Sequence, residues 1–390
     1  MKTESITSVA KNQEKATEIF GVDMGGKLWA TAIRNKETGK ISYFALTDKD
    51  GKSKEERLYE LVQSHIVQGY RVVVNYEAGR YGYAPARIMM ALKAEVNIIP
   101  IGKLRIVTHG KTQKTDKLDA KFLCNLDTDM DIDFPKVYIP TIEEESKKDA
   151  GREIDRLKKS IHSANQQMIA LFERTPLPHD CKHTSSIGWK QRIAELEKHP
   201  GLKDVPRFLL LRLSNMVKEL ELYEKELEEW NELIEKKEKK QQEKDAQKDN
   251  ADLCYETQRK LQQFKGIGSD LARFFVWELS NWSRFPNAKK FTSYFGLVPC
   301  PYASGTMNRE QGISKSGRNA LRKKAIELGW LWVRWQKESF LVKKWQDRLN
   351  EKGRVRRMAI VALTRQMLVA LWRYIIKGEP IEGAVMNNPL

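Results

Sequence analysis

Length, composition and charge limit the class of protein before any motif is considered. The chain has 390 residues, of which 41% are hydrophobic and 9% aromatic, enough for more than one folded core. Its 69 Lys and Arg residues outnumber its 52 Asp and Glu residues, which gives a net charge of +17. The apolar content excludes a disordered low-complexity chain. The excess of positive charge favours a polyanionic partner, with nucleic acid as the first candidate.

A membrane surface is the weaker candidate partner. The most apolar stretch lies near the C-terminus and is interrupted by Arg365 and Arg373, so the sequence predicts no membrane-spanning segment. The first residues lack the apolar core of a secretory signal. The four cysteines are far apart, as expected of reduced thiols in a cytoplasm: Cys124, Cys181, Cys254 and Cys300.

The first part of the chain alternates short apolar runs with amphipathic ones. Three apolar runs come first: TEIFGVD, KLWATAIR and ISYFAL. Helical patterns then alternate with the apolar runs RVVVNYE and VNIIPI, and a last helix carries KTDKLDAKFL. Three strands followed by alternating helices and strands predict an α/β layer fold with a mixed sheet over residues 17–125.

After Pro140 the apolar residues are spaced three and four apart. One seam runs from Ile154 to Leu171, and a second runs without a break from Leu209 to Ile234. This a/d spacing predicts two long helices in a coiled coil. The sequence leaves open whether the helices pair within one chain or between chains.

A third part of the chain is rich in helix formers, tryptophan and arginine. Between Lys315 and Lys377 there are 17 Lys and Arg residues against 4 Asp and Glu, so much of the positive charge is concentrated there. We therefore expect an N-terminal α/β domain over 1–140, a coiled-coil connector over 141–254 and a mainly helical domain over 255–390.

Four carboxylates stand at the ends of predicted elements in the N-terminal domain. Asp23 ends the first strand in GVDMGG, and Glu77 ends the fourth in NYEAG. Asp116 and Asp119 lie one helical turn apart and share one face of the last helix. If the four side chains converge, a cation must offset their repulsion. Mg²⁺ or Mn²⁺ would suit such a set and would support phosphoryl transfer on nucleic acid.

Two further motifs lie in the C-terminal domain. The stretch FKGIGSDLARFFVWEL predicts a helix, a turn through Gly266 and Gly268, and a second helix whose first backbone amides can hold a phosphate. Ser304 follows in a polar loop, ahead of ISKSGRNALR and a basic helix. We expect Ser314 and Ser316 to cap the start of that helix.

Taken in order, these motifs resemble one family, the transposases of the insertion-sequence family numbered one hundred and ten, also called DEDD or bridge-RNA-guided recombinases. GVDMGG, NYEAG and KTDKLDA match in the first half, and GIG, YFGLVP, ASG and GISKSGRNALR in the second. The resemblance spans nearly the whole chain. It implies an RNase H-like (RuvC-like) N-terminal domain, a coiled-coil connector, and a C-terminal transposase domain with a nucleophilic serine.

The resemblance also implies residue roles and partners. The metal ligands would be Asp23, Glu77, Asp116 and Asp119, and the nucleophile would be Ser304. A noncoding guide RNA, the bridge RNA, would pair with double-stranded target and donor DNA, so that base pairing supplies the choice of sequence. Subunits would form homodimers that assemble into a homotetramer.

The serine segment departs from the family pattern at two positions. The family often has a second serine before the nucleophile and a glycine after it, whereas this chain has Ala303 and Thr306. A serine hydroxyl needs a base or a metal for activation, and Mg²⁺ on the carboxylates could help Ser304 displace a DNA hydroxyl. The candidates for binding phosphate charge are Arg309, Lys315, Arg318 and Arg322.

Two other functions remain open. A RuvC-like junction nuclease would use the carboxylates and water without the serine, and a noncatalytic RNA or DNA scaffold would need only the charge and the coiled coil. Four tryptophans at helical spacing could stack on bases, but their spacing favours a core: Trp330, Trp332, Trp335 and Trp345. The segment HDCKH, 179–183, has no second half at zinc-finger spacing, which favours a loop.

Overall fold

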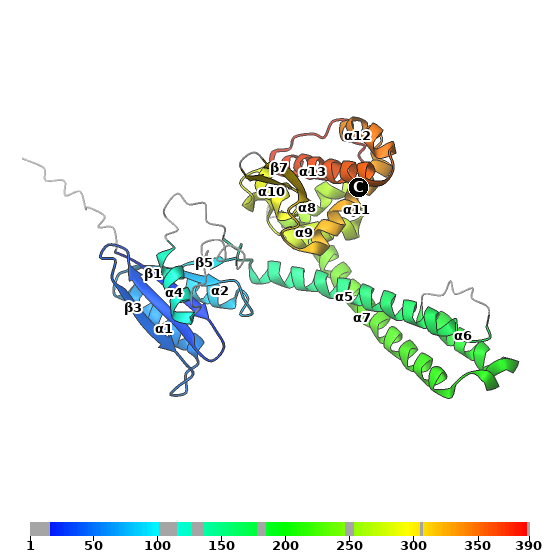
Figure 1. The fold of residues 1–390 in the computed structure, drawn as a ribbon, viewed down its shortest axis with the longest axis horizontal. Coiled ribbons are helices and arrows are strands. Elements are labelled where there is room, and N and C mark those ends of the chain that lie inside the picture. The colour runs from blue at the N-terminus through cyan, green and yellow to red at the C-terminus, as the bar shows by residue number, and fades with distance from the viewer. Residues whose placement is uncertain are drawn as a thin grey trace, which may run out of the picture. The chain divides into compact units, whose positions relative to one another are not determined.

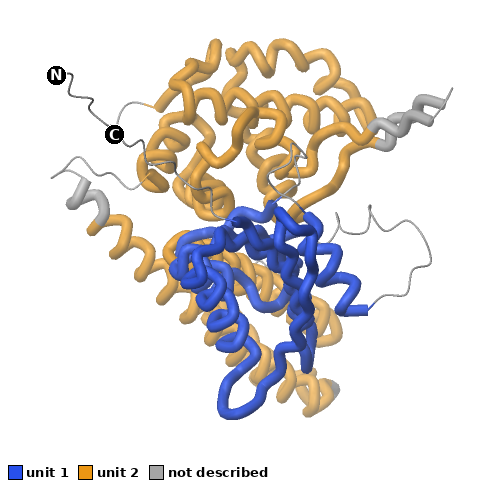
Figure 2. The backbone as a smooth tube through the Cα atoms, turned by 90° about the vertical axis from the view of Figure 1, so that its left-hand side faces the viewer, with its two compact units in different colours: residues 1–141 blue, residues 142–390 orange. Residues whose placement is uncertain are grey.

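The structure is a computed structural model that describes residues 16–100, 115–126, 136–177, 185–245, 253–304 and 307–387. The chain divides into two compact units, residues 1–141 and residues 142–390 (Figure 2). The second unit contains both the long helices and the C-terminal helices. The division into three domains therefore stays a prediction.

The first unit is built on a five-stranded mixed sheet with the order β3-β2-β1-β4-β5. Its strands are β1 (Thr17–Met24), β2 (Trp29–Asn35), β3 (Ile41–Leu46), β4 (Arg71–Glu77) and β5 (Glu95–Ile99). The pairs β1–β2 and β2–β3 are antiparallel, and the pairs β1–β4 and β4–β5 are parallel. The predicted mixed sheet is confirmed, while its assignment to the RNase H-like class stays a prediction.

Helices cover both faces of this sheet, and they are α1 (Lys54–Val67), α2 (Ala84–Ala91) and α4 (Asp116–Asn125). Helix α1 starts with a capping box, in which the Ser53 hydroxyl accepts from the Glu56 amide and the Glu56 carboxylate accepts from the Ser53 amide. Buried residues of α1 and α2 share one core with β1 and β4. Helix α4 packs on the other face, where its Ala120 and Cys124 meet two alanines of β2.

Polar side chains of the sheet hold the C-terminal end of α4. The buried amide of Asn75 donates to the carbonyls of Leu123 and Leu126 at 3.0 and 2.9 Å. The Nε of Arg34 donates to the carbonyl of Cys124 at 3.0 Å. Because the last carbonyls of a helix have no partner within it, these bonds fix where α4 ends on the sheet.

The second unit begins with long helices, which are α5 (Ile142–Phe172), α6 (Ser186–Lys198), η1 (Pro200–Asp204) and α7 (Arg207–Asp245). Helices α5 and α7 pack along each other, and α6 packs on α7 near their far end (Figure 1). Trp189 of α6 is fully buried and donates from Nε1 to Asn165 Oδ1 of α5 at 2.6 Å. The predicted helices therefore pair within the chain in this structure.

The C-terminal part of this unit is mainly helical around one core. Its elements are α8 (Leu253–Gln262), α9 (Ser269–Leu279), η2 (Trp282–Arg284), α10 (Ala288–Tyr294), β6 (Pro299–Ser304), β7 (Met307–Ile313), α11 (Asn319–Trp335), α12 (Phe340–Asn350) and α13 (Gly353–Lys377). By length and composition alone α13 could cross a membrane. Half of that stretch is buried, with Leu363, Met367 and Leu371 in the core, as in a core helix.

The prediction that Ser314 and Ser316 cap the start of α11 is wrong. The N-cap residue is Arg318, whose side chain makes no capping hydrogen bond. The hydroxyls of Ser314 and Ser316 instead bond to each other at 3.0 Å. The reason is the left-handed backbone of Gly317, with φ of 75°, which keeps the helix from starting directly after Ser316.

Candidate functional site

Asp23 and Glu77 lie next to each other at one edge of the sheet. Val22 of β1 pairs in parallel with Tyr76 of β4, and the two acids are the next residues on these strands. The side chains of Val22 and Tyr76 are buried in the core shared with α1 and α2. Because side chains alternate along a strand, Asp23 and Glu77 point toward the face that α4 covers.

Close contact at Gly21 holds α4 against this face. A Cβ atom added at Gly21 would lie 2.1 Å from the carbonyl oxygen of Ala120 and 2.3 Å from the amide nitrogen of Cys124. The partner of Asp23 on β2 is Ala30, which also packs against Ala120. The backbone of α4 therefore touches β1 two residues before Asp23.

The first turn of α4 points toward the same edge. Directly after β1, a Cβ atom added at Gly25 would lie 3.7 Å from Oδ2 of Asp116. Helix α4 thus runs opposite to β1, and its first turn, with Asp116 and Asp119, lies beside the segment that follows Asp23. Thr115 caps this turn by accepting from the Leu118 amide. The backbone therefore brings all four predicted acids to one edge of the sheet.

The two strand-end acids line a common hollow of about 180 Å³. Its lining residues are Asp23, Met24, Tyr76, Glu77, Ala78, Gly79, Tyr81 and Gly82. Within the described residues, however, no three His, Cys, Asp or Glu side chains come together as a set that could hold a metal ion. The carboxylates fit Mg²⁺ or Mn²⁺ in donor chemistry and in backbone placement. In this structure their side chains do not come close enough together to form the predicted metal site.

Tyr81 connects the two loops that follow Asp23 and Glu77. Its hydroxyl donates to the carbonyl of Gly25 at 3.1 Å and accepts from Nε1 of Trp29 at 3.2 Å and from Arg80 at 3.0 Å. Partial burial alone would raise the pKa of Tyr81, but the bonds from Trp29 and Arg80 hold it below its ordinary value. No sequence pattern marks this residue, although it stands four positions after Glu77.

Ser304 lies at the tip of a β-hairpin in the second unit. It is the last residue of β6 and pairs with Met307, the first residue of β7. The predicted polar loop is therefore part of a pair of antiparallel strands, and residues 305 and 306 between the strands lie outside the described residues. Arg309 lies in β7 opposite Tyr302.

The structure gives different surroundings to the other basic candidates. Arg318 contacts the buried carboxylate of Glu278, which also lies 3.5 Å from Arg152. Burial, and then the neighbouring Arg152 cation, lowers the pKa of Arg318. Arg322 donates to the carbonyl of Ser316 at 3.1 Å, and Lys315 is exposed. Arg318 and Arg322 thus hold the fold locally, and phosphate binding by all of these residues stays a prediction.

The predicted helix, turn and helix around GIG are present, formed by α8 and α9. Gly266 has φ of 95°, and a Cβ atom there would lie 2.8 Å from the ring of Trp335. Gly268 is the N-cap of α9, and a Cβ atom there would meet nothing within 4 Å. The backbone at Gly268 is open to approach, but phosphate binding at the GIG turn is untested.

The four tryptophans divide into two pairs. Trp332 is 1% exposed, and Trp345 is half-buried with a hydrogen bond to Gln366 at 3.1 Å, so the core prediction is confirmed for these two. Trp330 and Trp335 are 36% and 42% exposed, so the core prediction is wrong for them. Helical spacing alone cannot distinguish the two faces of α11. The segment 179–183 lies outside the described residues.

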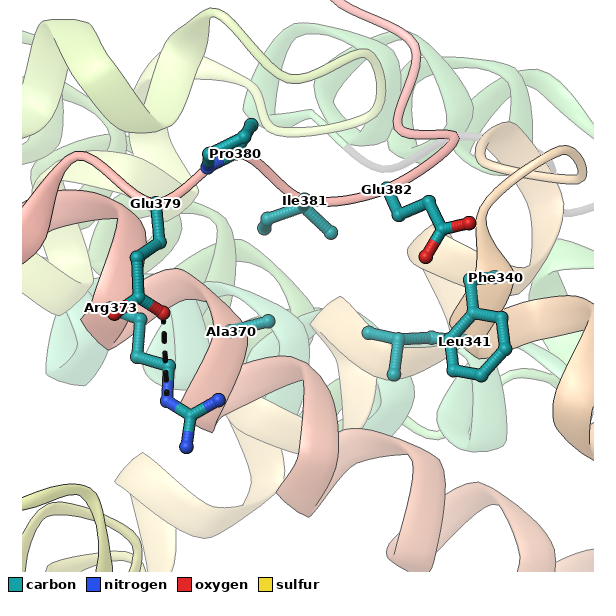
Figure 3. Close-up of a pocket in the computed structure, with 8 residues that line it drawn as sticks. All are labelled: Phe340, Leu341, Ala370, Arg373, Glu379, Pro380, Ile381 and Glu382. Carbon is teal, nitrogen blue, oxygen red and sulfur yellow. Dashed lines mark ion pairs between the residues drawn. The ribbon is translucent and has the colours of Figure 1, made fainter.

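A second hollow, of about 150 Å³, lies between α12, α13 and the C-terminal segment (Figure 3). Arg373 and Glu379 form an ion pair of 3.8 Å on one side of it. None of the predicted site residues is among its lining residues. We therefore do not assign it to the candidate site.

Comparisons with known proteins point to DNA processing. Residues 258–342, which include the GIG turn and Ser304, match the family model described as "Transposase IS116/IS110/IS902 family". The chain is 29% identical over 340 residues to y4rJ of Sinorhizobium fredii (strain NBRC 101917 / NGR234), whose name gives it as a proposed transposase. This similarity covers 82% of the chain and 81% of the relative.

Two shorter similarities involve proteins named for DNA inversion. The pilin gene-inverting proteins of Moraxella bovis and Moraxella lacunata are each 25% identical to the chain over 126 residues. These matches cover 32% of the chain and 38% of each relative. Together the comparisons support an enzyme that processes DNA. The family they support is that of the IS110 transposases.

Proposed function

We propose that the chain is a transposase that cuts and rejoins the DNA of a mobile element through a Ser304–DNA phosphodiester, assisted by a divalent cation. The observation that carries this proposal is the match of residues 258–342 to a transposase model, on a chain whose Asp23 and Glu77 share one sheet edge. The order and directions of the five strands support an RNase H-like assignment of the first unit.

The metal site is proposed at the edge where β1, β4 and α4 meet. Its ligands would be Asp23, Glu77, Asp116 and Asp119, with Mg²⁺ or Mn²⁺ as the ion. When bound, the ion would neutralise charge on the scissile phosphate. The protein's own contribution is placement, because Gly21 and Asn75 fix α4 on the sheet and Tyr81 fixes the loop after Asp23.

The serine step follows from ordinary phosphoryl transfer. The Ser304 oxygen would bond to phosphorus while the bond from phosphorus to one DNA oxygen breaks, and that oxygen would leave as a hydroxyl. Attack by a hydroxyl of the partner duplex would then reverse the step and release Ser304. The position of Ser304 at the tip of a hairpin supports this role, since a DNA strand can approach a hairpin tip more easily than a helix interior.

The proposal includes the partners that the family resemblance implies. A guide RNA would choose the target and donor DNA by base pairing, which leaves the protein to hold phosphates, as its +17 charge allows. Homodimers would assemble into a tetramer, and the protein would act in the cytoplasm.

The test compares wild type, Ser304→Ala and the control Ser293→Ala on end-labelled DNA substrate with guide RNA, resolved on denaturing gels. Ser293 lies on α10, where its hydroxyl bonds to the Lys289 carbonyl, so its loss should leave the reaction intact. We expect a protein-linked strand with wild type and the control, and none with Ser304→Ala.

The same gel separates the alternatives. Undiminished recombination by Ser304→Ala would contradict the serine mechanism. Chelator-sensitive free ends without any protein-linked strand would instead favour a junction nuclease. Nucleic-acid binding without metal-dependent strand breakage would favour a scaffold.

A further inference from the structure

An exposed basic surface lies at the start of α13 in the second unit. The residues from 351 to 358 are all exposed, whereas Ala359 and Ile360, which follow, are buried. The first turns of α13 therefore extend beyond the core that holds the rest of the helix. This extension carries four cations: Lys352, Arg354, Arg356 and Arg357.

These cations differ from others in the same unit because they lack acidic partners. Arg318 contacts Glu278, and Lys343 lies 2.8 Å from Glu338. Among the residues that the structure describes, Lys352, Arg354 and Arg357 make no ion pair. Four like charges within six residues repel one another more than the one adjacent carboxylate, Glu351, can offset, and a bound polyanion would relieve that repulsion.

An exposed indole stands beside these cations. Trp330 of α11 is 36% exposed, and the guanidinium of Arg356 lies over its ring at 5.0 Å from the centroid. The neighbouring residue Gly329 lets α11 approach α13 closely, because a Cβ atom there would lie 2.1 Å from Oγ1 of Thr364 on α13. Helices α11 and α13, which lie side by side in Figure 1, thus hold Trp330 and the basic extension together.

We propose that Trp330 and the cations 352–357 form a binding surface for single-stranded nucleic acid, with a base stacked on the indole and phosphates on the arginines. The proposal rests on the proposed function only in taking the polyanion to be nucleic acid. Cations alone would suit a duplex equally well, but a partly exposed indole that already holds the planar guanidinium of Arg356 is suited to stacking on unpaired bases. An anionic membrane would require a longer apolar face than Val355 and Met358 provide.

Stacking is tested on the full chain by fluorescence anisotropy with labelled oligonucleotides of about 20 nucleotides: oligo-dT, oligo-rU and a DNA duplex of equal length. Trp330→Leu keeps an apolar side chain but removes the ring, so it should weaken single-strand binding by roughly tenfold and leave duplex binding unchanged. Trp330→Phe keeps a ring and should retain most of the affinity. Comparison of oligo-dT with oligo-rU distinguishes DNA from RNA as the preferred strand.

The charge contribution is tested by the salt dependence of oligo-dT binding. The double variant Arg354→Ala/Arg357→Ala should reduce the slope of log affinity against log salt by roughly one to two units, because each phosphate contact on a single strand contributes about 0.7. Arg373→Ala is the matched control. It removes one cation from the other end of α13, where Glu379 lies 3.8 Å away, and should leave the slope unchanged.

Distinct outcomes overturn the inference and the proposed function. If wild type binds nucleic acid but Trp330→Leu and the double arginine variant bind as wild type does, the inference is wrong and the proposed function stands. Binding to phosphatidylglycerol vesicles that oligo-dT does not compete away would assign the surface to a membrane instead. If wild type binds no nucleic acid at all, both proposals fail. Circular dichroism of each variant checks that it is folded.

Discussion

The carbonyl oxygen of Ala120 lies 2.1 Å from the place that a Cβ atom on Gly21 would occupy. A strand and a helix that are about 100 residues apart in sequence are therefore in direct backbone contact. Candidate metal ligands stand close to this contact on both elements: Asp23 is two residues after Gly21 on the strand, and Asp119 directly precedes Ala120 on the helix. The geometry of the candidate metal site thus depends on the absence of a side chain at Gly21.

Gly21→Ala should displace α4 from the sheet. The atoms in the way are backbone atoms, which cannot rotate aside, so we expect a loss of stability of about 1–3 kcal/mol or more and loss of metal-dependent strand cleavage. Gly26→Ala is the control, because a Cβ atom at Gly26 would meet nothing within 4 Å. Thermal unfolding and cleavage assays on both variants provide the check. Equal behaviour of the two variants would show that α4 does not pack on β1 at this point.

Tyr81→Phe should loosen the loop that follows Asp23. The variant removes a hydroxyl that donates to Gly25 and accepts from Trp29, so we expect a loss of about 1 kcal/mol in stability and a larger relative loss in cleavage rate. Tyr43→Phe, at an exposed position of β3, is the control. A cleavage rate of Tyr81→Phe that equals the rate of Tyr43→Phe would remove Tyr81 from the site.

Lys148 should make stability depend on pH. Burial, and then the nearby Arg284 cation, lowers the pKa of Lys148 from its ordinary 10.5 to about 8. Between these pH values the unfolded chain binds more protons than the folded chain, so stability should rise with pH from about 8 to 10.5. The shift corresponds to roughly 3 kcal/mol across that window.

The variant Lys148→Met should remove the pH dependence of stability, because methionine has a similar length but no titratable group. Urea unfolding of wild type and variant between pH 7 and 10.5 should show the wild type gaining stability relative to the variant. Lys159→Met, at an exposed position of the same helix, should follow the wild-type curve. Parallel curves for wild type and Lys148→Met would mean that folding does not lower the pKa of Lys148.

Gly329→Ala should separate α11 from α13. The added methyl group would lie 2.1 Å from Oγ1 of Thr364, a fully buried residue, so we expect a loss of about 1–3 kcal/mol. The double variant Gly329→Ala/Thr364→Ala removes the clashing oxygen and should recover part of this loss. If the double variant is no more stable than the sum of the two single variants predicts, the helices do not cross at these residues.

Much of the fold followed from periodicity. Alternating apolar runs predicted the mixed sheet, and the a/d seams predicted the long helices, because both patterns reflect burial along a single element. The contact of Gly21 with Ala120 could not be predicted in this way, since a glycine within an apolar strand carries no periodic signal. The hydrogen bonds of Tyr81 depend on two loops that meet only in the folded chain.

The candidate site could be predicted only in part, because sequence patterns describe single elements and not the contacts between them. Strand ends and helix starts placed Asp23, Glu77, Asp116 and Asp119 at one edge, but sequence could not give the directions of their side chains. The sequence suggested Arg318 as a candidate for binding phosphate charge, yet it contacts buried Glu278, which lies 40 residues earlier. Trp330 and Trp332 share a helical pattern, and only the packing of α11 on its neighbours separates the exposed ring from the buried one.

Titration of the full chain with Mn²⁺ in the presence of substrate DNA and guide RNA, followed by the electron paramagnetic resonance signal of the free ion, tests the metal site most directly. Wild type and the control Asp149→Asn, at a position on α5, should each bind Mn²⁺, whereas Asp23→Asn and Glu77→Gln should each weaken binding by tenfold or more, as roughly expected for loss of a carboxylate ligand. Equal Mn²⁺ affinity in all four proteins would contradict a metal site at the edge of the sheet.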